Sequence, residues 1–159
     1  VDDGSDDDTA AIARAFGDGR VVVERHDDNR GVGAAIITGY ASALAHGADI
    51  ATVMAGDAQM DPRDLHAIVA PLLRDEADYV KGDRLSHPSV WSAMPLTRLL
   101  GNHVLSLLTR WVTGLAVRDS QCGYTALSRP GMALLSQVSL WPRYGYPNDL
   151  LGHLAEQGV

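Results

Sequence analysis

The chain has 159 residues, 46% of them hydrophobic and 21% charged, and a formal net charge of −7, which predicts one globular domain over residues 1–159 with a substantial core. This acidic balance excludes nucleic acid as a partner, because duplex binding requires clustered Lys and Arg to displace counterions. No apolar run reaches the roughly 18 residues of a membrane-spanning helix, and the single cysteine, Cys122, excludes an internal disulfide and fits a reducing compartment.

Segments of helical periodicity alternate along the chain with short apolar runs. The opening VDDGS predicts the end of a strand and a sharp turn, after which Ser5 caps a first helix with Ile12 and Phe16 on its apolar face. A β-branched run predicts a buried strand over 21–24. The apolar spacing that follows predicts a second helix over 37–47.

The rest of the chain continues this alternation. A leucine-rich stripe over 96–115 is typical of a helix whose apolar side packs in the core, and an interfacial role at a membrane surface is the alternative. Two prolines predict a loop over 87–95. Further strands are predicted over 49–57, 78–84 and 122–128, and further helices begin at an Asp61-Pro62 cap and at a cap formed by Asn148.

Strands that alternate with helices of this length predict βαβ units, and therefore an α/β fold with a mostly parallel sheet flanked by helices. Ligands of such sheets bind beyond the carboxyl ends of the strands. Polar or glycine-rich segments follow the predicted strands, so we expect them to gather at one edge of the sheet. These segments are VDDGS, HDDNRGVG, GDAQMDP, KGDR and the segment near DSQCGY.

Acidic residues crowd the first turn. Asp2 and Asp3 stand at the exit of the first predicted strand, where a carboxylate can accept hydrogen bonds from a nucleobase or a ribose hydroxyl. The three aspartates at 6–8 have a simpler interpretation, because acidic side chains are favourable near a helix N-terminus.

A second polar group follows the strand predicted over 49–57. Asp57 and Gln59 place oxygen atoms at alternate positions there, while Asp61 is interpreted as a helix cap. Mg²⁺ or Mn²⁺ takes oxygen ligands, usually one or two carboxylates together with substrate phosphates. We therefore expect Asp57 and Gln59 to hold a divalent metal.

Two further segments are candidates for contact with phosphate. The glycines of NRGVGAA, Gly33 among them, either bind a substrate or simply allow a helix to pack closely. Lys81 and Arg84 of KGDR follow a predicted strand, where they either meet a diphosphate or form surface ion pairs.

The ordered set VDDGS, NRGVGAA, D-A-Q-x-D-P, KGDR and DSQCGY resembles the family 2 glycosyltransferases of the GT-A fold. It is most similar to the branch that contains dolichyl- and polyprenyl-phosphate mannose and glucose synthases. The likeness covers nearly the whole chain. It implies a strand and a P-x-x-N-E loop before Val1, so that this chain is a fragment lacking the first strand, and a membrane-associated C-terminal part after Val159.

The resemblance also implies roles for residues. Asp3, with Asp2, binds a UDP- or GDP-linked sugar, and Asp57 and Gln59 reach the metal. Ala55 replaces the first aspartate of the family's D-x-D segment, so the metal site has one carboxylate fewer. Arg84 matches a basic residue that meets a phosphate. Asp119 and Gln121 match the segment that lines the acceptor side.

The implied reaction is inverting transfer of a sugar, in which a metal stabilises the departing nucleoside diphosphate. If the acceptor is a polyprenyl phosphate, the nucleophile is already an anion and Arg84 positions it. If the acceptor is a sugar hydroxyl, a base is required, and Asp119 is the candidate. A lipid acceptor implies peripheral membrane contact, at the cytoplasmic face of a membrane.

Two other function classes compete with this reading. The alanine at position 55 favours a non-catalytic nucleotide-binding or interaction module on the same fold. A dinucleotide-binding oxidoreductase would need a complete G-x-G-x-x-G after the first strand with an acid about 20 residues further on, and neither stands in the required place.

Overall fold

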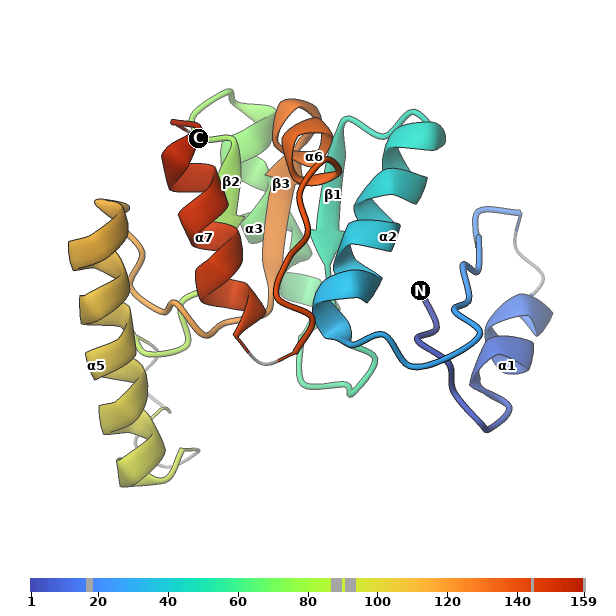
Figure 1. The fold of residues 1–159 in the computed structure, drawn as a ribbon, viewed down its shortest axis with the longest axis horizontal. Helices are drawn as coiled ribbons and strands as arrows, with labels where there is room; N and C mark the ends of the chain where they lie inside the picture. Colours follow the sequence, from blue (N-terminus) through green and yellow to red (C-terminus); the bar gives the residue numbers. More distant parts are fainter. Residues whose placement is uncertain (17–18, 87–89, 91–93, 144, 159) are drawn as a thin grey trace.

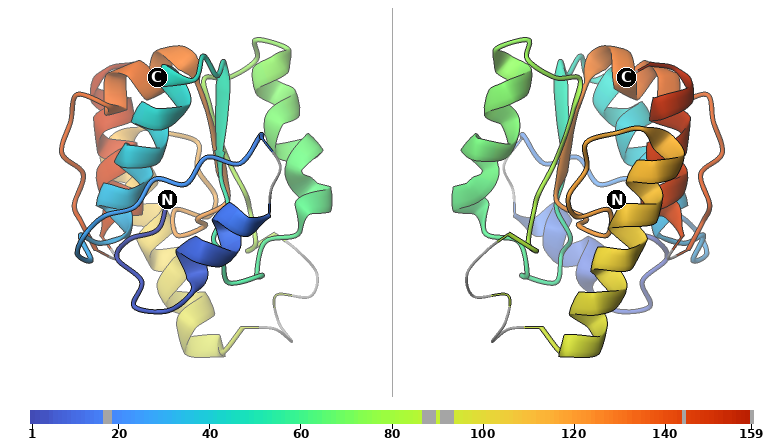
Figure 2. Two further views of the ribbon diagram at one scale, coloured as in Figure 1. Left: turned by 90° about the vertical axis from the view of Figure 1, so that its right-hand side faces the viewer. Right: turned by 90° about the vertical axis from the view of Figure 1, so that its left-hand side faces the viewer.

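A computed structural model describes residues 1–16, 19–86, 90, 94–143 and 145–158. Three strands form one sheet in the described part of the chain, with helices on both of its faces (Figures 1 and 2). The elements are α1 (Thr9–Ala15), α2 (Val32–Ala45), β1 (Ile50–Val53), the 3-10 turn η1 (Pro62–Asp64), α3 (Leu65–Leu73), β2 (Tyr79–Lys81), α5 (Leu96–Thr113), β3 (Thr125–Ser128), α6 (Arg129–Leu135) and α7 (Tyr146–Glu156).

The sheet has the order β1-β3-β2, and β3 runs antiparallel to both neighbours. The expectation of a mostly parallel sheet is therefore wrong for the described residues, although their architecture is α/β. The crossover through α3 keeps β1 and β2 parallel in direction, but β3 enters between them from the opposite end, so both ladders are antiparallel. Ile50 pairs with Ser128 and Lys81 pairs with Thr125.

The predicted strand over 21–24 does not join this sheet. Val21 and Val22 are exposed. The pairing found in this region is a parallel bridge between Asp2 and Arg25, with hydrogen bonds from the Asp2 amide to the Glu24 carbonyl and from the His26 amide to the Asp2 carbonyl. One bridge is not a ladder, so the β-branched run stays extended without becoming a strand.

The core lies on both faces of the sheet, and the edge-on views of Figure 2 show helices on both of these faces. Leu127 of β3, fully buried, faces α2, α6 and α7, while Ala126, the next residue, faces α3. This alternation is what a strand with two covered faces requires. The cluster on the three-helix side contains Ile36, Tyr40, Leu127, Met132, Leu135, Leu140, Leu150 and Leu154.

Capping was predicted with mixed success. Asp61 accepts a hydrogen bond from the Arg63 amide at 2.9 Å, which confirms the predicted cap. The first helix begins after Asp8 rather than Ser5, and its Ile12 and Phe16 are exposed. α7 begins before Asn148, whose side chain is used elsewhere. The loop predicted over 87–95 lies mostly outside the described residues.

The leucine stripe of α5 is exposed, so the expectation that it packs in the core is wrong. Asn102, Ser106 and Thr109 of the same helix are buried instead. Figure 1 shows α5 at the margin of the molecule, beside α7 and away from the sheet. The helix thus turns its polar side inward and its apolar side outward.

A groove of about 830 Å³ lies along the outer edge of β1. Val1 and Val22 line one part of it, Ile36 and Tyr40 of α2 another, and Ala51 to Gly56 of β1 and the following loop a third. The groove therefore leads toward the loop that carries Asp57.

Candidate active site

The loops that follow β1 and β2 and the loop that precedes β3 meet at one edge of the sheet, the lower edge in Figure 1. Contacts join them: the Tyr124 hydroxyl donates to the Asp61 carbonyl at 3.3 Å, and Gly123 lies against Met60. The prediction that these polar segments gather at one edge is confirmed for GDAQMDP, KGDR and DSQCGY.

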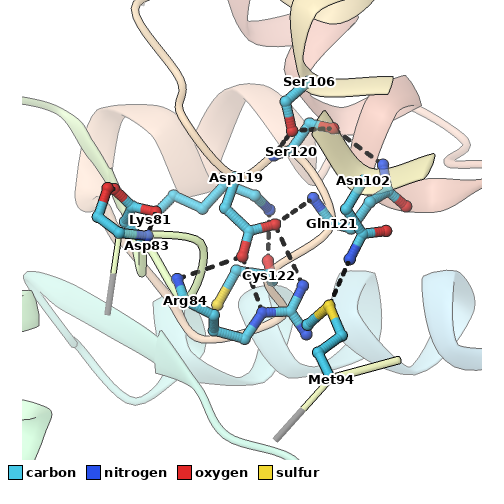
Figure 3. Close-up of polar contacts among 11 residues, drawn as sticks. Lys81, Asp83, Arg84, Met94, Asn102, Ser106, Asp119, Ser120, Gln121 and Cys122 are labelled. Atoms are coloured by element: carbon cyan, nitrogen blue, oxygen red, sulfur yellow. Dashed lines mark hydrogen bonds and ion pairs between the residues drawn. The ribbon is translucent and has the colours of Figure 1, made fainter. Parts of the chain in front are cut away.

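Arg84 and Asp119 are the centre of this edge (Figure 3). Nε of Arg84 donates to Oδ2 of Asp119 at 2.8 Å, and Nη2 donates to Oδ1 at 3.1 Å. The Asp119 side chain is fully buried, whereas 38% of the Arg84 side chain is exposed. The hydrogen bonds to Asp119 raise the pKa of Arg84, so the guanidinium is a permanent cation on a partly exposed side chain.

Backbone amides complete the coordination of this carboxylate. The Arg84 amide donates to Oδ2 at 3.3 Å and the Gln121 amide to Oδ1 at 3.1 Å. Asp119 thus accepts four hydrogen bonds, about the capacity of a carboxylate. A bidentate pair of this kind fixes the plane as well as the position of a guanidinium.

A chain of polar side chains connects this centre to α5 and α7. Nε2 of Gln121 donates to Oγ of Ser120 at 3.0 Å and to Oδ1 of Asn148 at 3.1 Å. The Ser120 amide donates to Oγ of Ser106 at 2.9 Å. The Thr109 hydroxyl lies 3.1 Å from the same Asn148 oxygen. The loop at 119–121 is therefore held from two helices.

Lys81 is the second cation of the site. Its Nζ donates to the Cys122 carbonyl, and burial lowers the pKa of Lys81 to about 8. Lys81 lines a pocket of about 290 Å³ together with residues 116–119. Burial also raises the pKa of the Cys122 thiol, which fits a packing role for that side chain.

Asp57 and Gln59 lie on the exposed loop after β1. Oδ1 of Asp57 accepts a hydrogen bond from the Gln59 amide at 3.0 Å, and Ala58 between them has a φ of 59°. One carboxylate and one amide oxygen on an open loop are donors that fit Mg²⁺ or Mn²⁺. Among the described residues, no group of three or more His, Cys, Asp or Glu side chains is arranged to hold a metal ion.

Asp2 and Asp3 are used within the chain. Asp3 accepts hydrogen bonds from His26 at 2.6 Å, the Arg30 amide at 2.9 Å and the Gly31 amide at 2.7 Å. Burial alone would raise the pKa of Asp3, but these hydrogen bonds outweigh it and the pKa lies below its usual value. Asp3 thus orders the turn before α2.

Asp2 is buried beside it. Oδ1 of Asp2 accepts a hydrogen bond from the Ser5 amide at 3.1 Å. Oδ2 is buried without a hydrogen bond, and Nε of Arg25 lies 3.3 Å away, within ion-pair distance but without hydrogen-bond alignment. The hydrogen bond from Ser5 lowers the pKa of Asp2, so the carboxylate is charged at neutral pH.

Gly33 adopts the packing role that the sequence left open. A Cβ at this position would lie 2.2 Å from the Trp141 carbonyl oxygen. The Gly33 amide donates to the Pro142 carbonyl at 3.0 Å. The start of α2 therefore packs directly against the backbone at 141–142, and this amide is already used.

Sequence reasoning missed two residues that organise the site. His26, which no motif singles out, is buried and bridges Asp3 to the Thr38 hydroxyl, with Nε2 of His26 2.9 Å from that hydroxyl. Asn148, interpreted as a helix cap, accepts a hydrogen bond from the Gln121 side chain. Both residues act through partners that are distant in sequence, so local spacing carries no signal for them.

Comparison with known proteins identifies the same class as the motifs. The profile of the family described as "Glycosyl transferase family 2" matches residues 1–132. A UDP-N-acetylglucosamine–dolichyl-phosphate N-acetylglucosaminyltransferase of Methanococcus voltae is 35% identical over 158 residues, which covers 91% of this chain and 63% of that protein. A polyprenol monophosphomannose synthase of Mycolicibacterium smegmatis is 30% identical over 132 residues, covering 81% of this chain and 49% of the relative.

An uncharacterized glycosyltransferase of Mycobacterium tuberculosis is 35% identical over 158 residues, with 99% of this chain and 66% of the relative covered. The chain thus spans about half to two thirds of the length of these relatives. The family profile covers most of the chain, and it includes the segments with Asp2, Asp57, Arg84 and Asp119. This chain belongs to glycosyl transferase family 2.

Proposed function

We propose that the protein transfers a sugar, with inversion, from a UDP- or GDP-linked donor to a polyprenyl phosphate. The observation that carries the proposal is the geometry of Arg84. Nε and Nη2 of its guanidinium are held by Asp119, and 38% of the side chain is exposed. A cation oriented in this way can hold a phosphate through two further hydrogen bonds.

The state of Asp119 favours a phosphate acceptor over a sugar hydroxyl. A hydroxyl nucleophile needs a base with a free lone pair. The Asp119 carboxylate is fully buried and accepts four hydrogen bonds, so it has little capacity to take a proton from a substrate. A lipid phosphate attacks as an anion, and in that reaction Asp119 serves as a positioning residue for Arg84.

Asp57 and Gln59 are proposed to hold the divalent metal, with the donor diphosphate and water supplying the other ligands. When bound, such a cation neutralises charge on a leaving nucleoside diphosphate. Lys81 is placed near the same edge and adds positive charge. Asp3 orders the turn before α2 through the Arg30 and Gly31 amides, and Asp2 holds the Ser5 amide beside it; we propose these two aspartates as a boundary of the nucleotide site.

The names of the relatives support the acceptor class. One relative is named for transfer to dolichyl phosphate and another for synthesis of polyprenol monophosphomannose. Both acceptors are lipid phosphates, which is the chemistry that Arg84 fits.

The test is calorimetry of the full-length protein with UDP- and GDP-sugars, with and without Mn²⁺, followed by transfer assays on a polyprenyl phosphate. We expect metal-dependent donor binding, its loss in Asp57→Ala, and no change in Asp75→Asn, which alters an exposed aspartate after α3. Donor binding without any transfer would instead support the non-catalytic module that Ala55 suggests. Unchanged metal-dependent binding in Asp57→Ala would contradict the metal assignment.

A further inference from the structure

The outer surface of α5 is apolar over most of its length. Its inward side carries Leu99, Asn102, Ser106 and Thr109, all less than 9% exposed. Trp111 is 82% exposed. At 3.6 residues per turn, the outward side forms a continuous arc of roughly 160°. Its members are Leu96, Leu100, Val104, Leu107, Leu108, Trp111 and Val112, and we refer to them as the α5 face.

Hydrogen bonds fix the helix in this orientation. Ser106 is bonded to Ser120, and Thr109 shares the Asn148 oxygen with Gln121. Turning the α5 face inward would break these contacts and bury apolar side chains against polar ones, at the cost of unpaired buried donors and acceptors. The exposure of the α5 face is therefore a property of the fold. Contiguous apolar surface of this extent marks an interaction site.

The charge of α5 identifies the kind of partner. The protein as a whole carries a net charge of −7, yet residues 96–113 contain no Asp or Glu. Arg98, His103 and Arg110 are exposed, and the helical period places them along the two borders of the α5 face. An apolar arc bordered by basic side chains, here with an arginine on each border, is the pattern of a helix that lies in the headgroup region of an anionic bilayer.

No described helix is long and apolar enough to cross a membrane, so the α5 face fits contact with the bilayer surface and not insertion across it. We propose that α5 docks on an anionic lipid surface through this face, with Trp111 at the headgroup boundary. Trp side chains are enriched at that depth.

Docking in this way would deliver the acceptor to the site, and this part of the argument rests on the proposed function. The loop at 119–121 joins the buried side of α5 to Arg84. A lipid phosphate could therefore keep its chain in the bilayer beside α5 while its headgroup reaches the guanidinium.

The experiment uses the full-length protein, vesicles of zwitterionic lipid with or without anionic lipid, and bromine-labelled acyl chains that quench nearby tryptophan. Quenching is measured in the wild type, in Trp111→Phe and in Trp141→Phe, because Trp141 is an exposed tryptophan on another segment. We expect anionic vesicles to quench fluorescence in the wild type and in Trp141→Phe, and this component to disappear in Trp111→Phe. Equal quenching in wild type and Trp111→Phe would overturn the proposal.

Two further variants test the mechanism of docking. Leu107→Glu should abolish the Trp111 quenching, whereas Phe16→Glu, at a comparably exposed position just after α1, should leave it intact. Arg98→Gln and Arg110→Gln should each weaken binding to anionic vesicles by about fivefold. A salt-insensitive dimer that Leu107→Glu dissociates would assign the α5 face to a second copy of the chain and overturn the proposal.

Donor binding separates this proposal from the proposed function. Leu107→Glu should bind the nucleotide-sugar as the wild type does and lose transfer to acceptors in vesicles, while keeping transfer to a short-chain acceptor in solution. Loss of transfer to both acceptors would contradict the docking role, and absence of transfer by the wild type would contradict the proposed function.

Discussion

Arg84 and Asp119 are 35 positions apart in the sequence and form a bidentate ion pair at 2.8 and 3.1 Å, with the carboxylate fully buried and the guanidinium partly open. Removing one partner of such a pair leaves the other without compensation. The pair is therefore both a structural contact and the support of the cation that we place at the acceptor phosphate.

Arg84→Lys should keep the charge and lose the fork that joins Asp119 to a phosphate. Loss of one bidentate contact predicts a rise of about tenfold in KM for the polyprenyl phosphate, with a smaller change in donor binding. Steady-state kinetics with varied acceptor provide the measurement. Arg74→Lys, which alters an exposed arginine paired with Glu76, is the matched control, and an equal effect in the control would contradict the role of Arg84.

Asp119→Asn should separate positioning from base catalysis. The amide keeps the shape but cannot neutralise Arg84, so we expect a loss of about 1–3 kcal/mol in the free energy of unfolding. Thermal denaturation measures this change. For a positioning residue the pH profile of kcat should keep its shape while KM for the acceptor rises; loss of the acidic limb of that profile would instead identify Asp119 as a base.

The metal site offers a gain-of-function test. Ala55 is exposed on the same loop as Asp57 and Gln59. Ala55→Asp adds a carboxylate to a donor set that contains one, and hard divalent cations bind more tightly as carboxylates are added. We expect calorimetry to show tighter Mn²⁺ binding in the presence of donor. An unchanged affinity would show that the loop does not hold the metal.

Lys81 should make stability depend on pH in the alkaline range. Burial lowers its pKa from 10.5 to about 8. Between pH 8 and pH 10.5, Lys81 is protonated in the unfolded chain and mostly neutral in the folded protein. The destabilising effect of burying the cation is therefore complete below pH 8 and is relieved as pH rises toward 10.5. The stability advantage of Lys81→Met over the wild type should shrink by on the order of 3 kcal/mol from pH 7 to pH 10.5. Denaturant titrations at several pH values would measure it, and a constant difference would contradict the burial of the charge.

Alanine substitutions at two helical glycines should change the free energy of unfolding in opposite directions. Gly33→Ala would place a Cβ 2.2 Å from the Trp141 carbonyl oxygen, whereas a Cβ at Gly152 of α7 meets nothing within 4 Å. We expect Gly33→Ala to lower the unfolding free energy by more than about 2 kcal/mol, and Gly152→Ala to raise it by about 0.5–1 kcal/mol. Calorimetric melting of both variants checks the pair of signs.

The caps predicted at Ser5 and Asn148 did not form. Other local signals were reliable, and the Asp61-Pro62 start and the helical period of α5 are examples. The direction of β3 was not predictable in this way, because the apolar run at 122–128 fits a parallel or an antiparallel partner equally well. The burial of the polar side of α5 was not predictable either. Polar side chains face inward there only because they form hydrogen bonds with Ser120 and Asn148.

The candidate site was also predicted from the sequence only in part. The motifs located Arg84, Asp119 and Gln121 at one edge of the sheet, and the contacts join them. The part played by Asp3 was a matter of tertiary contact: its carboxylate takes up His26 and two backbone amides. An aspartate at the end of a strand indicates that its carboxylate accepts hydrogen bonds there. The identity of the donor depends on how distant segments pack.

The position of β3 between β1 and β2 has a consequence for how the protein is made. Ile50 pairs with Ser128 and Lys81 pairs with Thr125, so neither earlier strand has its ladder partner until residues 125–128 have left the ribosome. Pairings this distant in sequence form slowly and leave nascent chains exposed. We expect chains truncated before Thr125 to show no hydrogen-exchange protection at β1 or β2, and protection there would mean that the strands find other partners during synthesis.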